Sequence, residues 1–140
     1  MAKILCLDLG TKRIGVAISD DLGMIARALT TIERGSDEEL FETLKRILKE
    51  ESAGEIVIGL PLNMDGSHGP KAMEASSFAE TLEKKLDRPV KLWDERMSTM
   101  EAERVMIEAD TSRRKRKRKI DKLAACVILQ SYLNAIGNKL

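Results

Sequence analysis

Three short apolar segments fill the first 32 residues, and the links between them are only four residues long. The segments 3–9, 14–19 and 24–32 have the length and apolar character of β-strands. Strands joined by such short links must run antiparallel, because a parallel connection needs about a dozen residues. The chain is therefore expected to begin as an antiparallel three-strand meander.

Helical periodicity replaces the strand pattern after residue 35. Ser36 and Glu39 form a capping box, in which each side chain satisfies a backbone N–H at the start of a helix. Apolar residues follow at helical spacing until Gly54. The remaining elements are predicted as strands over 55–60 and 89–94, a helix from Pro70 whose apolar stripe includes Met73, Phe78, Leu82 and Leu86, and helices over 98–109 and 120–136.

This order of elements predicts an α/β fold with one domain over residues 1–140. Strands connected through helices pair in parallel by right-handed crossovers. They extend the meander into a mixed five-stranded sheet with helices on both faces, as in ribonuclease-H-like proteins. The sequence shows no secretory leader and no apolar run near the ~20 residues that span a bilayer, so a cytoplasmic protein is expected.

Two strands carry carboxylates in unusual places. Asp8 lies inside an apolar strand, where an uncompensated carboxylate is costly. A cation, backbone N–H donors or a metal could compensate it, and capping of the Gly10 turn is an alternative. Asp94 and Glu95 end the last predicted strand, where neighbouring side chains point to opposite faces. Glu95 is expected to face Asp8. Asp94 is expected to pair with Arg96 at an exposed strand end.

A third carboxylate, Asp121, is predicted at the start of the last helix. An acidic residue is favourable there through capping and the helix dipole alone. However, small and apolar residues share its helical face, which indicates that this face turns toward the sheet. These neighbours are Ala124, Ala125, Ile128 and Tyr132.

Asp8, Glu95 and Asp121 can converge at one end of the sheet. Clustered carboxylates repel one another and need divalent cations to be tolerated. All-oxygen ligands suit Mg²⁺ or Mn²⁺ better than zinc. One or two such ions can activate a water and stabilise the leaving oxygen of a phosphodiester. The three residues therefore predict a catalytic metal site.

Seven consecutive basic residues precede this third carboxylate. Without them the net charge of +1 would become clearly negative, so positive charge is concentrated in one segment. Such a segment indicates contact with a polyanion, and a solvated loop is the alternative. We predict a loop that closes on a nucleic-acid backbone through Arg113, Arg114, Lys115, Arg116, Lys117, Arg118 and Lys119.

Four groups of residues resemble the YqgF or RuvX family of Holliday-junction-resolvase-like proteins. They follow the family's order: LDLGTK (7–12) with IGVA (14–17), GLP (59–61) with NMDG (63–66), DER (94–96) with ST (98–99) and EA (101–102), and KID (119–121) with AA (124–125). The resemblance implies a ribonuclease-H-like fold and a nuclease site at Asp8, Glu95 and Asp121. It also implies maturation of the 5′ end of pre-16S ribosomal RNA, with Holliday junction resolution as the alternative activity.

Other polar residues near these motifs could take part. Lys12 and Arg13 could contact substrate phosphates or could be exposed turn charges, and Arg96 is a further candidate for binding nucleic acid. His68 and Asn63 lie in a loop rich in turn-forming residues. A surface role for His68 and a structural role for Asn63 are expected.

Two other functions are less consistent with the sequence. The segment 8–11 also resembles the first phosphate loop of actin-like ATPases, but those proteins need two lobes and 140 residues provide one. A nucleic-acid-binding protein without catalysis would gain nothing from carboxylates facing phosphates. Because charged residues dominate the helix exteriors, a monomer or weak homodimer is expected. Such a protein suits structured or single-stranded RNA better than paired cuts in branched DNA.

Overall fold

The computed structural model describes residues 2–97 and 113–137, and for 113–122 it describes the backbone alone. Five strands form one sheet. In chain order the elements are β1 (Lys3–Leu9), β2 (Arg13–Ser19), β3 (Ala26–Glu33), α1 (Asp37–Glu51), β4 (Ala53–Leu60), α2 (Pro70–Leu86), β5 (Val90–Asp94), the 3-10 turn η1 (Glu95–Met97) and α4 (Arg113–Gly137).

The strand order of the sheet is β3-β2-β1-β4-β5. β1 pairs antiparallel with β2, which pairs antiparallel with β3. β4 lies parallel to β1, and β5 lies parallel to β4. The predicted meander and its parallel extension are both confirmed. The carboxyl ends of β1, β4 and β5 consequently meet at one end of the sheet.

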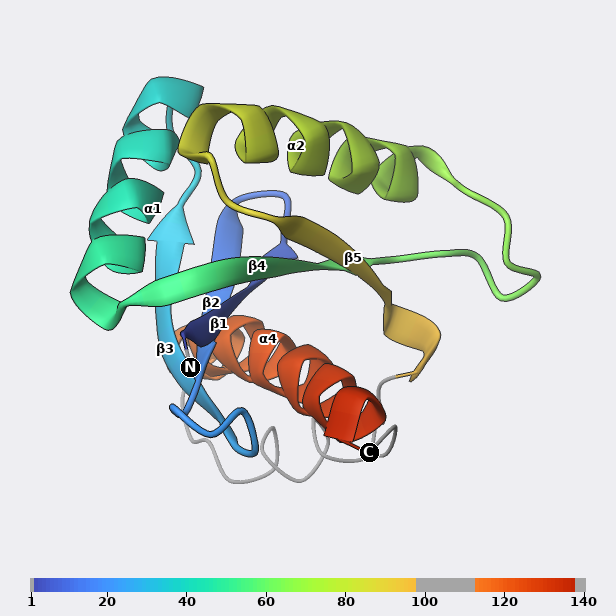
Figure 1. Cartoon of the computed structure of the whole chain (residues 1–140). Helices are drawn as coiled ribbons and strands as arrows, with labels where there is room; N and C mark the ends of the chain where they lie inside the picture. Colours follow the sequence, from blue (N-terminus) through green and yellow to red (C-terminus); the bar gives the residue numbers. More distant parts are fainter. Residues whose placement is uncertain (1, 98–112, 138–140) are drawn as a thin grey trace.

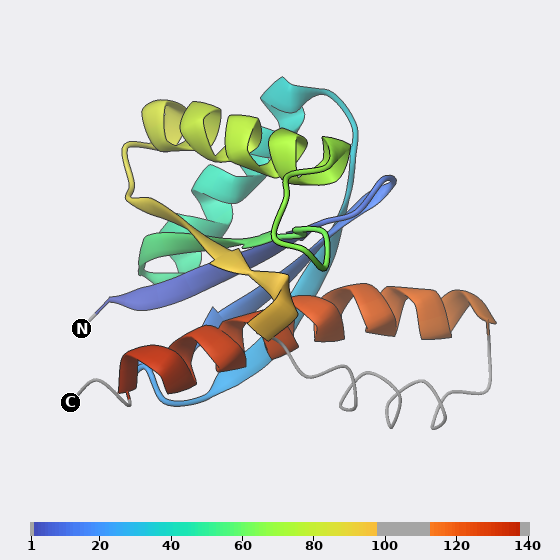
Figure 2. The same ribbon diagram turned by 90° about the vertical axis from the view of Figure 1, so that its right-hand side faces the viewer.

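The two faces of the sheet pack against different helices. α1 and α2 cover one face and α4 crosses the other (Figures 1 and 2). Alternation along β1 divides the core between them. Leu5 and Leu7 are buried on the side of α1 and α2, whereas Ile4 and Cys6 are buried on the side of α4. By the same alternation, Asp8 belongs to the face that α4 covers.

The predicted start of α1 is confirmed, because its cap forms as expected. Ser36 accepts a hydrogen bond from the backbone N–H of Glu39 at 3.2 Å. The predicted end at Gly54 is wrong, since the helix ends at Glu51, Ser52 caps it in the left-handed conformation, and Gly54 lies inside β4. The stripe predicted for α2 is partly wrong, since Met73 is 64% exposed. Alanines with small side chains take over much of the contact with the sheet and let the helix approach closely. The buried residues of α2 are Ala72, Ala75, Ala79, Leu82 and Leu86.

The predicted loop over 113–119 is wrong, because these residues form the first turns of α4. Figure 2 shows the beginning of α4 extending past the end of the sheet. Turns that have no sheet beside them need no apolar stripe, so the apolar pattern starts later than the helix. Asp121 therefore lies more than two turns inside α4, and N-terminal capping does not explain it.

Two further findings concern the helices. The helix predicted over 98–109 lies outside the described residues. Within 2–97 and 113–137, every helix is too short or too polar to cross a membrane.

The contact between α4 and the sheet can be tested by removing one buried side chain. Leu129 is fully buried in the core between α4 and the sheet. We expect Leu129→Ala to lower the free energy of unfolding by about 2–5 kcal/mol, through lost burial and a residual cavity. The matched control is Leu22→Ala, because Leu22 is 73% exposed. It should change stability by less than about 0.5 kcal/mol. Urea denaturation of both variants would measure this, and equal effects would contradict the packing.

Candidate active site

Asp8 lies between two glycines at the carboxyl end of β1. On one side it pairs with Gly15 of β2. On the other side β1 pairs in parallel with β4, and Leu7 lies opposite Ile58. One residue further along both strands, Asp8 lies beside Gly59. No side chain from an adjacent strand therefore covers the face beside Asp8. On the Gly59 side, Glu95 and Ile128, which come from outside these strands, enter that space instead.

Glu95, the first residue of η1 directly after β5, approaches the same glycine. A Cβ added to Gly59 would lie 3.1 Å from Cγ of Glu95 and 2.8 Å from Cδ1 of Ile128. Contacts this short would force the side chains of Ile128 and Glu95 to shift. Glycine at position 59 thus lets both the acid and the helix close onto β4. The structure brings Asp8 and Glu95 to the two sides of Gly59.

The charges of these two acids affect the pKa of the Cys6 thiol. It is fully buried on the same face as Asp8, two residues earlier in β1. Burial raises the pKa of the Cys6 thiol well above its ordinary value, and the charges of Asp8 and Glu95 raise it further. Two carboxylates that act on one buried thiol also act on each other. Their repulsion is the physical reason to expect a cation at this site.

Asp94 does not join Asp8 and Glu95, because its carboxylate forms an ion pair with Arg96 instead. The Arg96 guanidinium donates to both carboxylate oxygens at 2.8–3.1 Å, and its backbone N–H adds a bond at 2.9 Å. These bonds lower the pKa of Asp94. Arg96 also donates to the carbonyl of Met64 at 3.2 Å. The predicted ion pair is confirmed, and it anchors the turn that carries Glu95 to the loop 61–69.

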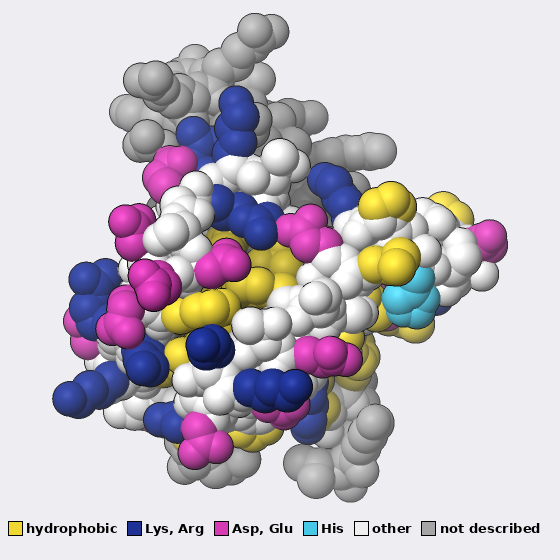
Figure 3. Space-filling view, turned by 90° about the horizontal axis from the view of Figure 1, so that it is seen from above, with side chains coloured by type: hydrophobic (Ala, Val, Ile, Leu, Met, Phe, Trp, Pro, Cys, Tyr) yellow, Lys and Arg dark blue, Asp and Glu magenta, His cyan; other side chains and the backbone are white. Residues whose placement is uncertain are grey.

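That loop is held by its own polar residues. The Asn63 amide donates to Oγ of Ser67 at 2.9 Å, and its backbone N–H donates to the Ser67 carbonyl at 2.9 Å. Two hydrogen bonds from Ser67 lower the pKa of Asp65. The structural interpretation of Asn63 is therefore supported. His68 is exposed on the same projecting loop (Figure 3).

The other predicted site residues are placed less completely. The backbone of Asp121 lies on α4 one turn before Ala125, which is fully buried against the sheet. Its side chain and those of residues 113–119 lie outside the described part of the chain. Among the side chains that are described, no group of three His, Cys, Asp or Glu residues could hold a metal ion. Lys12 is exposed in the β1–β2 turn, and Arg13 donates to Glu33 at 2.9 Å.

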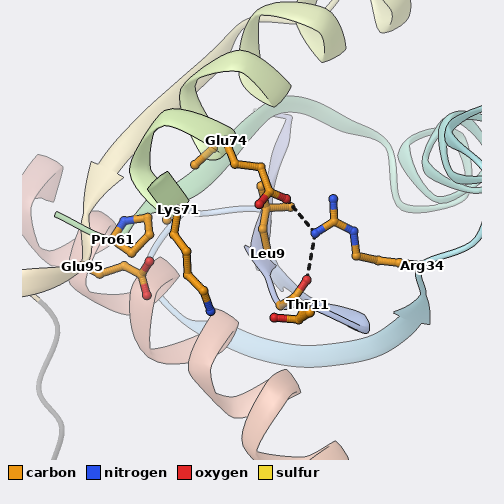
Figure 4. Close-up of a pocket in the computed structure, with 10 residues that line it drawn as sticks. Leu9, Thr11, Arg34, Pro61, Lys71, Glu74 and Glu95 are labelled. Carbon is orange, nitrogen blue, oxygen red and sulfur yellow. Dashed lines mark hydrogen bonds and ion pairs between the residues drawn. The ribbon is translucent and has the colours of Figure 1, made fainter. Parts of the chain in front are cut away.

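A pocket of about 300 Å³ opens beside Glu95 (Figure 4). Its wall includes Arg34, which donates to Glu74 at 2.8 Å and to the carbonyl of Gly10 at 2.8 Å. Lys71 also lines it. Sequence patterns do not single out Arg34, Lys71 or Glu74, because these residues come from distant segments and belong to no local motif. The pocket forms where the link after β3 and α2 meet the ends of β1 and β4 and the residue Glu95.

The sequence matches a known protein family over nearly its whole length. The model described as RuvX, Holliday junction resolvase, matches residues 2–135. The chain belongs to the RuvX family. A protein of Halothermothrix orenii named "Putative pre-16S rRNA nuclease" is 55% identical over 94% of this chain and 94% of its own length. A Thermoanaerobacter pseudethanolicus protein of the same name is 52% identical over 98% of this chain and 99% of its own length.

Solved structures show how this RuvX chain is folded. The Thermus thermophilus RuvC structure in complex with Holliday junction substrate has a TM-score of 0.61 at 12% identity, covering 99% of this chain and 97% of that one. The Fowlpox virus resolvase in its complex with Holliday junction DNA has a TM-score of 0.60 at 13% identity, covering 96% and 98%. The predicted ribonuclease-H-like fold is confirmed.

The ion pair of Asp94 and Arg96 makes stability depend on pH. The folded-state pKa of Asp94 is lowered, so its stabilisation is fully present above about pH 5 and is lost as the pH falls through that lowered value. We expect Asp94→Asn to be less stable than the wild type at pH 7 and equally stable in strong acid. Thermal unfolding against pH would measure this. Asp21→Asn, at an exposed position, controls for the loss of charge. A constant difference at all pH values would contradict the interpretation.

Proposed function

We propose that this chain is a divalent-metal-dependent nuclease of the cytoplasm that processes the 5′ end of pre-16S ribosomal RNA. In this proposal one domain over 1–140 carries the site, and Asp8, Glu95 and Asp121 hold the metal. The nuclease class follows from the family, because relatives more than half identical over nearly the whole chain are named as nucleases. The observation that carries the proposal on this chain is the approach of Asp8 and Glu95 around Gly59.

The donor chemistry of the site suits a hard cation. Asp8 and Glu95 offer carboxylate oxygens, which Mg²⁺ and Mn²⁺ prefer. Asp121, on the helix that crosses this face, would supply a third carboxylate. One or two bound ions would supply an activated water and stabilise the leaving oxygen.

The protein's own residues would prepare the reaction. Gly59 lets Glu95 and Ile128 lie against β4, next to the strand that carries Asp8. The ion pair between Asp94 and Arg96 fixes the turn on which Glu95 lies. The Glu95 carboxylate would therefore already be positioned before a substrate binds. The basic turns at the start of α4 precede Asp121 directly and would lead the nucleic-acid backbone to the acids.

The metal ligands can be tested by neutral substitutions of the same size. Asp8→Asn, Glu95→Gln and Asp121→Asn should each lower Mg²⁺-dependent cleavage of a labelled pre-16S RNA by about 100-fold or more, since changes beyond the direct ligands already cost about 10- to 100-fold. Stability should be kept or raised, because repulsion is relieved. Asp94→Asn should be milder. Full activity of purified Asp8→Asn would overturn the assignment.

The helical form of the basic run allows a sharper test of nucleic-acid binding. By helical spacing, positions 114, 117 and 118 lie on the side of α4 that carries Asp121, and positions 115, 116 and 119 lie on the opposite side. Replacing the first three by Gln should weaken RNA binding and flatten its salt slope by about 2, because each phosphate contact in a single strand contributes about 0.7. Replacing the second three is the charge-matched control.

The two triple variants should be compared by titration with labelled RNA at several salt concentrations. A larger loss in the first variant supports contact on the side of Asp121. Equal slopes in both variants and the wild type would show that the run is only solvated helix.

Holliday junction resolution is the second candidate, because the family description names it. Paired cuts in a junction need two active sites at a fixed spacing, which a two-fold dimer supplies. On the face formed by α1 and α2, Lys, Arg, Asp and Glu side chains surround a group of hydrophobic side chains (Figure 3). The mass of the protein in solution would show whether this face forms a stable dimer. A tight dimer that cuts a synthetic junction symmetrically and leaves the RNA intact would favour resolution.

A further inference from the structure

Lys71 contributes a positive charge to the pocket beside Glu95. It lies in the first turn of α2, and its side chain reaches into the space between Glu95 and Thr11 (Figure 4). Within the described residues, no carboxylate forms an ion pair with Lys71, and its side chain is exposed. The fold therefore gains little from this ammonium group. Its charge is available to a ligand.

The other cation of the pocket is already matched. Arg34 donates to the carboxylate of Glu74 and to the Gly10 carbonyl, both at 2.8 Å. These bonds offset the charges of Arg34 and Glu74 and join the β1–β2 turn to α2. With Arg34 and Glu74 paired, Lys71 and Glu95 are the remaining charged side chains of the pocket, and Lys71 is the one that attracts an anion. The first turn of α2 carries no acidic side chain to oppose it.

We propose that this pocket binds the backbone phosphate next to the phosphodiester that is cut, with Lys71 as its charged ligand. The inference rests on the proposed nuclease function. The pocket shares Glu95 and Gly59 with the acid site. A strand that places one phosphate at the acids must place the next one a single nucleoside away, and the pocket is the adjoining space. The Lys71 ammonium offers a point charge with three donors, and the Thr11 hydroxyl offers another donor.

The lining of the pocket favours a phosphate over a base. None of its ten residues is aromatic, so a base would find no ring to stack on. Contacts to phosphate position a strand without reading its sequence. Lys71 is therefore a positioning residue that acts on the register of the strand rather than on the choice of base.

The experiment measures binding without cleavage. Lys71→Ala is introduced into the Asp8→Asn chain, and affinity for a fluorescent single-stranded RNA is measured by anisotropy at several salt concentrations. We expect affinity to fall roughly 5- to 10-fold and the salt slope to fall by about 0.7, the contribution of one phosphate. Lys71→Arg should restore most of the binding. Lys84→Ala, in the last turn of the same helix and outside the pocket, should bind like the parent.

A neutral phosphate analogue locates the contact. RNA oligonucleotides with one methylphosphonate at each successive position are bound to both chains. The Asp8→Asn protein should bind more weakly when the methylphosphonate lies next to the cleaved bond. The Asp8→Asn protein that also carries Lys71→Ala should show no loss of affinity for that RNA, while its losses at other positions are kept. If the losses of affinity from Lys71→Ala and from the methylphosphonate at that position add together, the pocket assignment is wrong. An unchanged salt slope in Lys71→Ala would also overturn it. Failure of the nuclease function would appear separately, as absence of cleavage by the wild-type chain with Mg²⁺ or Mn²⁺.

Discussion

A carboxylate between two glycines is the constraint on which this end of the molecule depends. Asp8 has Gly15 on one side and Gly59 on the other, so three neighbouring strands offer one side chain where three would be usual. The missing side chains let Ile128 of α4 and the carboxylate of Glu95 come close to β4. Close packing and clustered charge thus have one cause. A side chain at position 59 would displace the side chains of both Glu95 and Ile128.

Sequence patterns predicted those parts of the fold that depend on local periodicity. Short links and apolar segments predicted the meander, and alternation at the end of β5 distinguished Asp94 from Glu95 correctly in the structure. The start of α4 was not predictable from apolar spacing, because its first turns have no sheet to face. Lys and Arg are nevertheless good helix formers, and this propensity is the signal that could have indicated a longer helix.

Other features depend on contacts between distant segments, which no local pattern records. The buried face of α2 is mostly alanine. A search for large apolar residues at helical spacing does not distinguish such a face from an exposed helix surface. The pocket requires Arg34 from the link after β3 to meet Glu74 of α2. Neither partner belongs to a recognisable motif. Prediction of such a site needs the packing of α2 on the sheet, which is decided only when the strands have assembled.

The helical form of the basic segment has a consequence for the direction in which a strand can lie. A loop could wrap around either orientation of a bound strand, but a helix presents its charges along a straight, stiff axis. A strand that follows this axis to the acids would continue into the pocket beside Glu95. The 5′ and 3′ neighbours of the cut bond would therefore meet different surfaces, so the enzyme would distinguish the chemical polarity of its substrate without reading a base.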